Sequence, residues 1–490
     1  MIIPHEVGVP GLKKVLILLL FLLPASLILL SCGGYSAPSS GGGSGIKYRA
    51  FITNNVSAGT GLAGVYVVDA ANDVRGSVSP ISAGNTPGMM VLTPNRTLTL
   101  VFSGNGTQFS DNQFTIIINA NEAAGGHVTL PGVTESFVVS PDGSAVYIAV
   151  PTAPVIGQPS PGVIDVISLG TGSKTAEISC PPKNPNPPDP PPPPVCVTKD
   201  QGDQGFNPPY HFLSIGNTGN RVLAFSQGSD SVANAIAVIT PSSVGTANPV
   251  VTFVPGFDHP VWAFFNSDDS TAYVVNCGAE CGGTQASVQT LDLRTNTAGT
   301  PVPIPAATVA VVNNSTMYLA GTPLPNPNPQ PCTGEMTQAT SCGLLTVFDL
   351  SSMTVTNTTP IIITDGYHNH MALGANGQLF IGARTCTEIV PPVPPPTGAE
   401  VRGCLSIYNT QSVPVGSIQP GAVTIPPTTG DVTGIQPIAT RDVVYVVQGR
   451  NVQGGTLYVY DTKTDAVDAV EEQKLSNLIG DFVDVKTIDF

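Results

Sequence analysis

Four histidines of this 490-residue sequence have residue types and spacing that could bind a metal ion. His211, His259, His368 and His370 lie in the segments PPYHFLS, FDHPVWA and GYHNHMALG, each near the start of a run rich in strand-forming residues. Neutral imidazole is the commonest side-chain ligand of transition metals. Because side chains alternate along a strand, His368 and His370 are expected to lie on one side of it. The histidines are therefore the candidate site for a metal or redox cofactor.

The surrounding sequence gives this chemistry little support. Counted from the turn that follows each strand, the four histidines occupy four different positions, so they are not expected to form a ring of ligands. Asp258 and Asp365 precede two of these strands and could orient an imidazole, although aspartate is also common in turns. The chain has no GxSxG, HExxH, phosphate-loop or dinucleotide-binding motif. We therefore expect no cofactor, with a transition metal as the alternative, and expect binding rather than catalysis.

The cysteines indicate disulfide bonds. Nine are present, and one of them, Cys32, follows an apolar N-terminal segment. The others fall into pairs that are close in sequence: Cys180 and Cys196, Cys277 and Cys281, Cys332 and Cys342, and Cys386 and Cys404. Pairing neighbours would close four short loops. Three of the pairs enclose proline-rich segments, PPKNPNPPDPPPPPV, the region around PLPNPNPQP, and PPVPPPTG, which cannot join a sheet. Metal ligation is the alternative, and the absence of CxxC spacing disfavours it.

The first 31 residues resemble the signal peptide of a bacterial lipoprotein. Lys13 and Lys14 precede an uncharged apolar run, Val15–Leu30, of 16 residues, which is shorter than a membrane-spanning helix of about 20 residues. Leu29, Leu30, Ser31, Cys32 and Gly33 resemble a lipobox, whose cysteine is acylated and becomes the new N-terminus. The resemblance implies palmitate-like acyl chains on Cys32, a flexible tether over residues 32–45, and attachment to the bacterial cell envelope, with the outer membrane favoured.

Composition is typical of an exported, non-helical body. Hydrophobic residues make up 41% of the chain and charged residues 10%, with 52 glycines and 48 prolines. The hydrophobic share is sufficient for a core, so the low charge does not indicate disorder. A formal net charge of -15 argues against nucleic acid as a partner.

A hairpin motif recurs through the chain. In SPDGSAVYIAV, residues 140–150, Pro141 and Gly143 favour a tight turn between the strand-like runs TESFVV and AVYIAV. Eight such runs occur, each followed by a second run that ends in a small polar turn, such as GVIDVISLGTG or GTLYVYDTKTD. The first runs are RAFITNN, LTLVFSGN, AVYIAV, RVLAFSQG, TAYVVNCG, TMYLAGTP, QLFIGART and VVYVVQGR.

These runs resemble the YVTN-type β-propeller repeat of bacterial and archaeal surface proteins. The resemblance covers Ile46–Phe490 and is strongest in SPDGSAVYIAV with GVIDVISLGTGSKTAEI and in GGTLYVYDTKTDAV. It implies an all-β fold, a single β-propeller of four-stranded blades that stack to bury their apolar faces. The repeats favour eight blades, with seven as the alternative. The first repeat lacks an innermost strand, and the C-terminal strand Asp481–Phe490 is expected to supply it and close the ring.

Blade topology predicts where the cysteine loops lie. Antiparallel strands place the loops after the second and fourth strands of every blade on one face, and the loops near 180–205, 277–281, 322–342 and 386–404 all follow such strands. We name this the stapled face; the four histidines would lie on it, at the channel mouth. We expect an envelope-anchored scaffold that binds a protein, a glycan or an envelope polymer there. The alternatives are an exported enzyme with a metal or redox cofactor and a surface-layer or adhesion component that self-associates.

Overall fold

The computed structural model describes residues 43–489 apart from several segments. Outside the described residues are 56–62, 105–109, 154–161, 179–196, 199–208, 228–233, 244–250, 325–341, 388–402, 412–420, 427–429, 440, 452–453, 476–477 and 479. The described residues all belong to one compact unit, Gly43–Phe490. The predicted signal peptide, Cys32, Cys180, Cys196 and Cys332 therefore lie outside the described residues.

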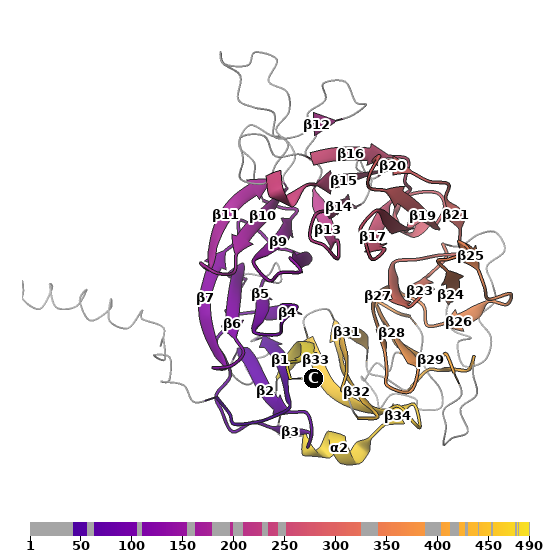
Figure 1. The fold of residues 1–490 in the computed structure, drawn as a ribbon. Helices are drawn as coiled ribbons and strands as arrows, with labels where there is room; N and C mark the ends of the chain where they lie inside the picture. The colour runs from indigo at the N-terminus through magenta and orange to yellow at the C-terminus, as the bar shows by residue number, and fades with distance from the viewer. Residues whose placement is uncertain are drawn as a thin grey trace, which may run out of the picture. The chain divides into compact units, whose positions relative to one another are not determined.

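Within the described residues, six antiparallel sheets share one pattern, in which four strands lie side by side in chain order (Figure 1). Three of them contain β4 (Pro87–Leu92), β5 (Leu98–Ser103), β6 (Gln113–Ile118) and β7 (Ala123–Thr129); β8 (Ser136–Val139), β9 (Ala145–Val150), β10 (Val163–Ser168) and β11 (Ser173–Ile178); and β13 (Tyr210–Ile215), β14 (Val222–Ser226), β15 (Ala235–Ile239) and β16 (Val251–Pro255). The other three contain β17 (Pro260–Phe265), β18 (Thr271–Asn276), β19 (Ser287–Asp292) and β20 (Thr297–Ala298); β22 (Val309–Asn313), β23 (Thr316–Gly321), β24 (Gly343–Asp349) and β25 (Thr354–Val355); and β27 (Tyr367–Leu373), β28 (Gln378–Arg384), β29 (Leu405–Asn409) and β30 (Val423–Thr424). Short strands β12 (Val197–Thr198), β21 (Val302–Pro303) and β26 (Ile361–Ile363) extend three of these sheets.

The two ends of the described chain meet in one further sheet. Its strands are β1 (Arg49–Asn55), β2 (Gly64–Asp69), β3 (Val74–Arg75), β31 (Asp431–Pro437), β32 (Val443–Asn451), β33 (Gly454–Asp461), β34 (Ala466–Val467) and β35 (Asp481–Thr487). The C-terminal β35 pairs with β1 from Ala50↔Thr487 to Asn55↔Asp481. Its link to β33 is a single pair, Gly455↔Phe482. The C-terminal strand thus joins N-terminal strands that it follows by more than four hundred residues.

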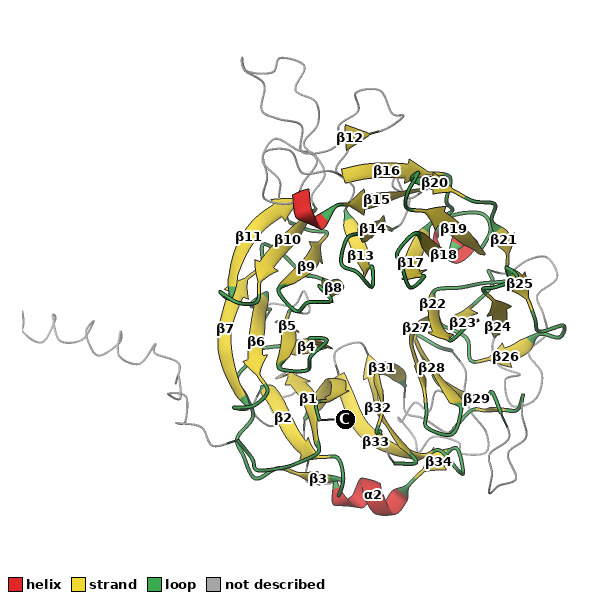
Figure 2. Cartoon of the chain, viewed as in Figure 1, coloured by secondary structure: helices red, strands yellow, loops and turns green. Residues whose placement is uncertain are grey.

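Helices are few and short in the described part of the chain (Figure 2). They are α2 (Ala469–Lys474) and the 3-10 turns η1 (Pro241–Ser243) and η2 (Gly278–Cys281). None of the described helices has the length and apolar character needed to cross a membrane. The predicted all-β character is therefore confirmed.

The hairpin predicted at residues 140–150 is also confirmed. β8 and β9 pair antiparallel up to Val139↔Val146. Gly143 has a φ of 70°, a conformation that glycine adopts without strain, and its N–H donates to the Ser140 carbonyl at 2.8 Å. Asp142 Oδ1 accepts from the Ser140 hydroxyl at 2.6 Å and the Ser144 N–H at 3.0 Å. Local side-chain hydrogen bonds therefore fix this turn independently of the rest of the fold.

Apolar side chains fill the spaces between neighbouring sheets. Phe114 of β6 packs edge-on against Phe137 of β8, with ring centroids 5.3 Å apart, and Phe380 of β28 packs in the same way against Tyr460 of β33. We name the first strands of the six four-stranded sheets, together with β31 at the edge of the terminal sheet, the inner strands. They contact one another in the order β4, β8, β13, β17, β22, β27 and β31. β31 then contacts β35, and β35 contacts β4. Each sheet therefore buries its two faces against the sheets before and after it.

Candidate functional site

Two loops of the stapled face are closed by disulfides. Cys277 is bonded to Cys281 directly after β18, and Cys386 is bonded to Cys404 between β28 and β29. Cys342 is also disulfide-bonded. β18 and β28 are each the second strand of their sheet, so both loops emerge at the edge where the inner strands begin.

Two aspartates at the starts of inner strands hold these loops. Asp258, before β17, accepts hydrogen bonds from the Gln285 N–H at 2.8 Å, the Thr284 N–H at 3.0 Å and the Thr284 hydroxyl at 2.5 Å. Asp365, before β27, accepts from the Thr387 N–H at 3.0 Å and from the Thr387 hydroxyl. Burial alone would raise the pKa of Asp258, but these hydrogen bonds lower it below its usual value. Asp258 therefore binds backbone just after the Cys277–Cys281 disulfide, and Asp365 binds backbone just inside the Cys386–Cys404 loop.

The four predicted histidines do not come together as a ligand set. His211 Nδ1 lies 3.4 Å from Glu135 Oε2, and His259 Nδ1 lies 3.1 Å from Asp258 Oδ1. Each of these imidazoles thus has a carboxylate neighbour of its own. In the described part of the chain, no group of three or more His, Cys, Asp or Glu side chains could hold a metal ion.

The prediction that His368 and His370 share one side of their strand is wrong. A β-bulge at Asn369 makes them pair with Ala383 and Gly382, which are adjacent on β28 and therefore face opposite ways. His368 is completely buried against Gly343, where an added Cβ would lie 2.6 Å from His368 Cε1. Burial lowers the pKa of His368 to about 4, so this imidazole is neutral near pH 7.

The bulge at Asn369 is one of a series. Register shifts also interrupt the starts of the inner strands at Tyr210/Phe212, Pro260/Trp262, Val432/Gly434 and Pro87/Met90. His211 is itself the extra residue of one of these bulges. An extra residue breaks the two-residue alternation of side chains. Alternation along the sequence therefore does not predict which side of the sheet a side chain faces at the start of these inner strands.

A different polar cluster lies around Arg384, at the end of β28. With the amide oxygen of Asn369 turned towards the guanidinium, that oxygen accepts from Arg384 Nε at 2.5 Å and Nη2 at 3.0 Å. The nitrogen of the same amide donates to His370 Nδ1 at 3.1 Å. Burial and then the positive charge of Arg384 lower the pKa of His370 to about 3. His370 therefore remains a neutral hydrogen-bonding group next to a fixed cation.

Two further groups of the cluster carry protons near neutral pH. Glu280 lies inside the Cys277–Cys281 loop and accepts from the Thr322 N–H at 2.8 Å, and burial raises its pKa to about 8. Burial, and then the charges of Glu280 and Glu135, raise the pKa of Tyr367 to about 12. A carboxylic acid, a phenol and a guanidinium at one edge suit hydrogen bonding to a ligand better than metal coordination. Glu280 is next to Cys281 in the sequence, and Arg384 is two residues before Cys386. Their positions beside the paired cysteines are the sequence signal that could have indicated these two residues.

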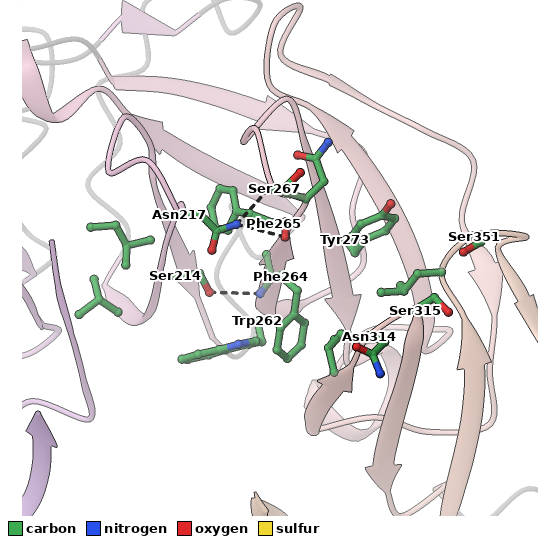
Figure 3. Close-up of a pocket in the computed structure, with 16 residues that line it drawn as sticks. Ser214, Asn217, Trp262, Phe264, Phe265, Ser267, Tyr273, Asn314, Ser315 and Ser351 are labelled. Atoms are coloured by element: carbon green, nitrogen blue, oxygen red, sulfur yellow. Dashed lines mark hydrogen bonds between the residues drawn. The ribbon is translucent and has the colours of Figure 1, made fainter. Parts of the chain in front are cut away.

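A cavity of about 700 Å³ lies at the other end of the inner strands (Figure 3). It is lined by residues of β13, β17 and β22, by the turns that follow β13, β17, β22 and β24, and by Val138 of β8 and Tyr273 of β18. Trp262, Phe264, Phe265 and Tyr273 supply aromatic surface, and serine and asparagine side chains supply polar groups. The sequence did not predict this cavity, since four separate turns contribute to it.

Comparison with known proteins supports the fold. No protein-family model and no curated protein sequence matches the chain. Among solved structures, the dihydro-heme d1 dehydrogenase NirN in complex with DHE is similar over 93% of this chain and 78% of that chain, with a TM-score of 0.55 and 12% identity. Hydrazine synthase from Kuenenia stuttgartiensis has a TM-score of 0.49 and 15% identity over 79% of this chain and 99% of that chain. The β-propeller domain of Cps50 (Swd1) from Myceliophteria thermophila has a TM-score of 0.44 and 9% identity over 78% of this chain and 98% of that chain.

Identities this low inform the fold alone. Taken with the repeated four-stranded antiparallel sheets, the similarity to NirN places this chain among proteins with a β-propeller fold.

Proposed function

We propose that this protein is a lipid-anchored β-propeller of the bacterial cell envelope whose stapled face binds a protein, a glycan or an envelope polymer. One observation carries the proposal: loops on that face are closed by disulfides and also held by Asp258 and Asp365. Backbone that is fixed before binding, as Thr284 and Thr387 are by these carboxylates, loses little conformational entropy when it binds. A disulfide and a carboxylate at each of these two places restrain the chain more than connecting two strands requires.

We infer that the propeller has eight blades of the YVTN type and that β35 closes the ring. The cycle of contacts among the inner strands supports this count, because β35 takes the place of an inner strand beside β1, β2 and β3. The large terminal sheet then consists of two blades, β35-β1-β2-β3 and β31-β32-β33-β34, which touch at Gly455↔Phe482. With eight blades, each of the eight pairs of strand-like runs found in the sequence supplies the two middle strands of one blade.

We propose that Cys32 carries the lipid anchor, on the basis of the lipobox-like sequence around it. Cys32→Ala should release the protein into the soluble fraction and abolish labelling with a palmitate analogue, because no acylated residue remains. Ser36→Ala in the tether is the matched control and should change neither. A Cys32→Ala protein that is still labelled would contradict the anchor.

Binding is tested by retention from envelope extracts on immobilised full-length protein. The pair Cys386→Ser and Cys404→Ser opens one stapled loop, and Arg294→Ala changes an exposed turn at the opposite end of the strands. We expect opening the loop to lower retention by about tenfold, equivalent to about 1.4 kcal/mol, and Arg294→Ala to have no effect. A ligand retained equally by all three proteins would contradict binding at the stapled face.

The other two functions are outcomes of measurements on the same preparation. About one transition metal per chain, lost when His368 and His370 are replaced together, would favour an exported enzyme. Concentration-dependent assembly of the purified protein would favour a self-associating surface component. A metal-free monomer that retains a ligand through its stapled loops is the result that the proposal predicts.

A further inference from the structure

The cavity opposite the stapled face has a built aromatic wall. Trp262 and Phe264 lie on one face of β17, because they pair with Val275 and Tyr273 of β18 in uninterrupted register. Tyr273, directly across from Phe264, shares that face. All three side chains are half-buried, and Trp262 is the only tryptophan of the chain. Figure 3 shows Trp262 and Phe264 projecting between Ser214 of β13 and Asn314 of the β22–β23 turn.

Polar groups around this wall have hydrogen-bonding capacity to spare. Among the described residues, the indole N–H of Trp262, the phenol of Tyr273 and the hydroxyls of Ser267 and Ser315 have no hydrogen-bond partner. Asn217 donates from Nδ2 to the Asn266 carbonyl at 2.9 Å, which leaves its Oδ1 as an acceptor. The set contains donors, acceptors and hydroxyls that can serve as either.

Charge is absent from the cavity wall. Among the described residues that line it, none is an acid, a base or a histidine. Carboxylates beside the wall are engaged in the turns: Asp269 accepts from the Asn217 N–H at 2.8 Å and the Thr218 N–H at 2.7 Å. Asp268 accepts from the Ser270 hydroxyl at 2.6 Å, and Asp349 accepts from the Ser351 N–H at 2.8 Å. An anionic ligand would find no counter-charge among the described residues that line the cavity and would lose hydration on entry.

The same contacts make the cavity rigid. Asp269 ties the β17–β18 turn to the β13–β14 turn, and Ser214 Oγ accepts from the Ala263 N–H at 3.2 Å (Figure 3). These bonds fix β13 relative to β17. A preformed cavity of about 700 Å³ falls within the range of about 300–1,000 Å³ that is typical of small-molecule sites.

We propose that this cavity binds an uncharged oligosaccharide. The apolar C–H face of a pyranose ring packs on the Trp262 and Phe264 rings, and its hydroxyls bond to Tyr273, Asn217 and the serine hydroxyls. A sugar matches the site because it combines one flat apolar face with many neutral donors and acceptors. The site lies at the other end of the strands from the stapled loops, so it stands or fails independently of the function proposed above.

The single tryptophan makes a direct assay available, since its fluorescence reports on this cavity alone. The full-length protein in detergent is titrated with maltotetraose, cellotetraose, mannotetraose and tetra-N-acetylchitotetraose, and with tetragalacturonate as the charged comparison. We expect a saturable change with at least one neutral tetramer, constant between pH 5 and 8, and none with tetragalacturonate. Tyr273→Phe should weaken binding about threefold to tenfold. Tyr147→Phe, at the matching position of β9 but outside the cavity, should leave binding unchanged.

Trp262→Ala, measured by calorimetry with near-ultraviolet circular dichroism to verify folding, should abolish the heat of binding. Three results would overturn the proposal: no binding of any neutral tetramer to folded wild-type protein, binding of tetragalacturonate alone, or neutral binding that neither Tyr273→Phe nor Trp262→Ala weakens. Since Tyr273→Phe keeps the ring, it decides the question even if Trp262→Ala fails to fold.

Discussion

Phe482→Ala is the substitution that most sharply tests whether β35 closes the fold. Phe482 is 2% exposed and packs in a cluster with residues of β1, β2, β32 and β33. Its ring meets Tyr66 edge-on, with centroids 6.1 Å apart and an interplanar angle of 88°. The side chain thus joins strands from the two ends of the chain.

The expected cost follows from that burial. Removing a buried phenylalanine ring costs about 3–5 kcal/mol when the cavity cannot collapse, and the edge-on aromatic pair falls within that figure. We therefore expect Phe482→Ala to lower the free energy of unfolding by about 4 kcal/mol, a large fraction of the roughly 5–15 kcal/mol of a typical folded protein. Val483→Ala is the matched control, because Val483 is the next residue of β35 and is only half-buried; its expected cost is below about 1 kcal/mol.

Urea unfolding read in two ways is the assay. Far-ultraviolet circular dichroism follows all strands, whereas Trp262 fluorescence follows β17. Along the series of inner-strand contacts, three strands lie between β17 and β35 in either direction. If β35 completes a ring, Phe482→Ala should lower both midpoints equally, since opening the ring destabilises every sheet. A loss below about 1 kcal/mol, or a Trp262 transition that keeps its wild-type midpoint, would refute the reasoning.

The remaining predictions concern buried ionisable groups. Arg441 donates to Asp73 from Nη1 at 2.7 Å and from Nη2 at 2.5 Å, so Arg441→Met should lower the free energy of unfolding by about 3 kcal/mol at pH 7. Hydrogen bonds lower the pKa of Asp73 despite burial, so the stability that this pair contributes should disappear as the pH falls below about 4. Equal losses at pH 7 and pH 3 would contradict this prediction. Burial lowers the pKa of His368 to about 4, so the free energy of unfolding of the wild type should fall by up to about 3 kcal/mol as the pH drops from about 6.5 to 4. The His368→Leu protein should not show this fall. Burial raises the pKa of Glu280 to about 8, so its contribution to folding stability is present below pH about 4.5 and lost as the pH rises towards 8. The Glu280→Gln protein should therefore gain stability relative to wild type over that pH interval. Parallel stability profiles of the two proteins would exclude a buried neutral acid.

The repeat pattern predicted the strands because its signals are local. Alternating apolar residues and a turn such as Ser140 to Ser144, held by its own side chains, specify a hairpin without reference to distant parts of the chain. The place of Asp481–Thr487 beside β1 was predictable for a related reason: a blade without an inner strand and a terminal strand without a blade complement each other.

The candidate site was predicted less well because bulges and tertiary contacts decide it. Alternation placed His368 and His370 on one side of a strand, whereas the bulge at Asn369 separates them. Asp258 and Asp365 were considered as orienting groups for a metal site, and the structure shows them binding loop backbone. The Trp262 cavity depends on turns about fifty residues apart, so neither composition nor spacing in the sequence could have indicated it.

The most direct test of a binding stapled face is site-specific photo-crosslinking in intact cells. A photoreactive amino acid replaces Gln285 or Thr385, which are exposed beside the two disulfide loops, or Arg294, whose side chain is 73% exposed at the other end of the strands. Our account predicts a covalent adduct of one defined mass from positions 285 and 385 and none from position 294. Adducts from position 294 alone, or the same adduct from all three positions, would contradict it.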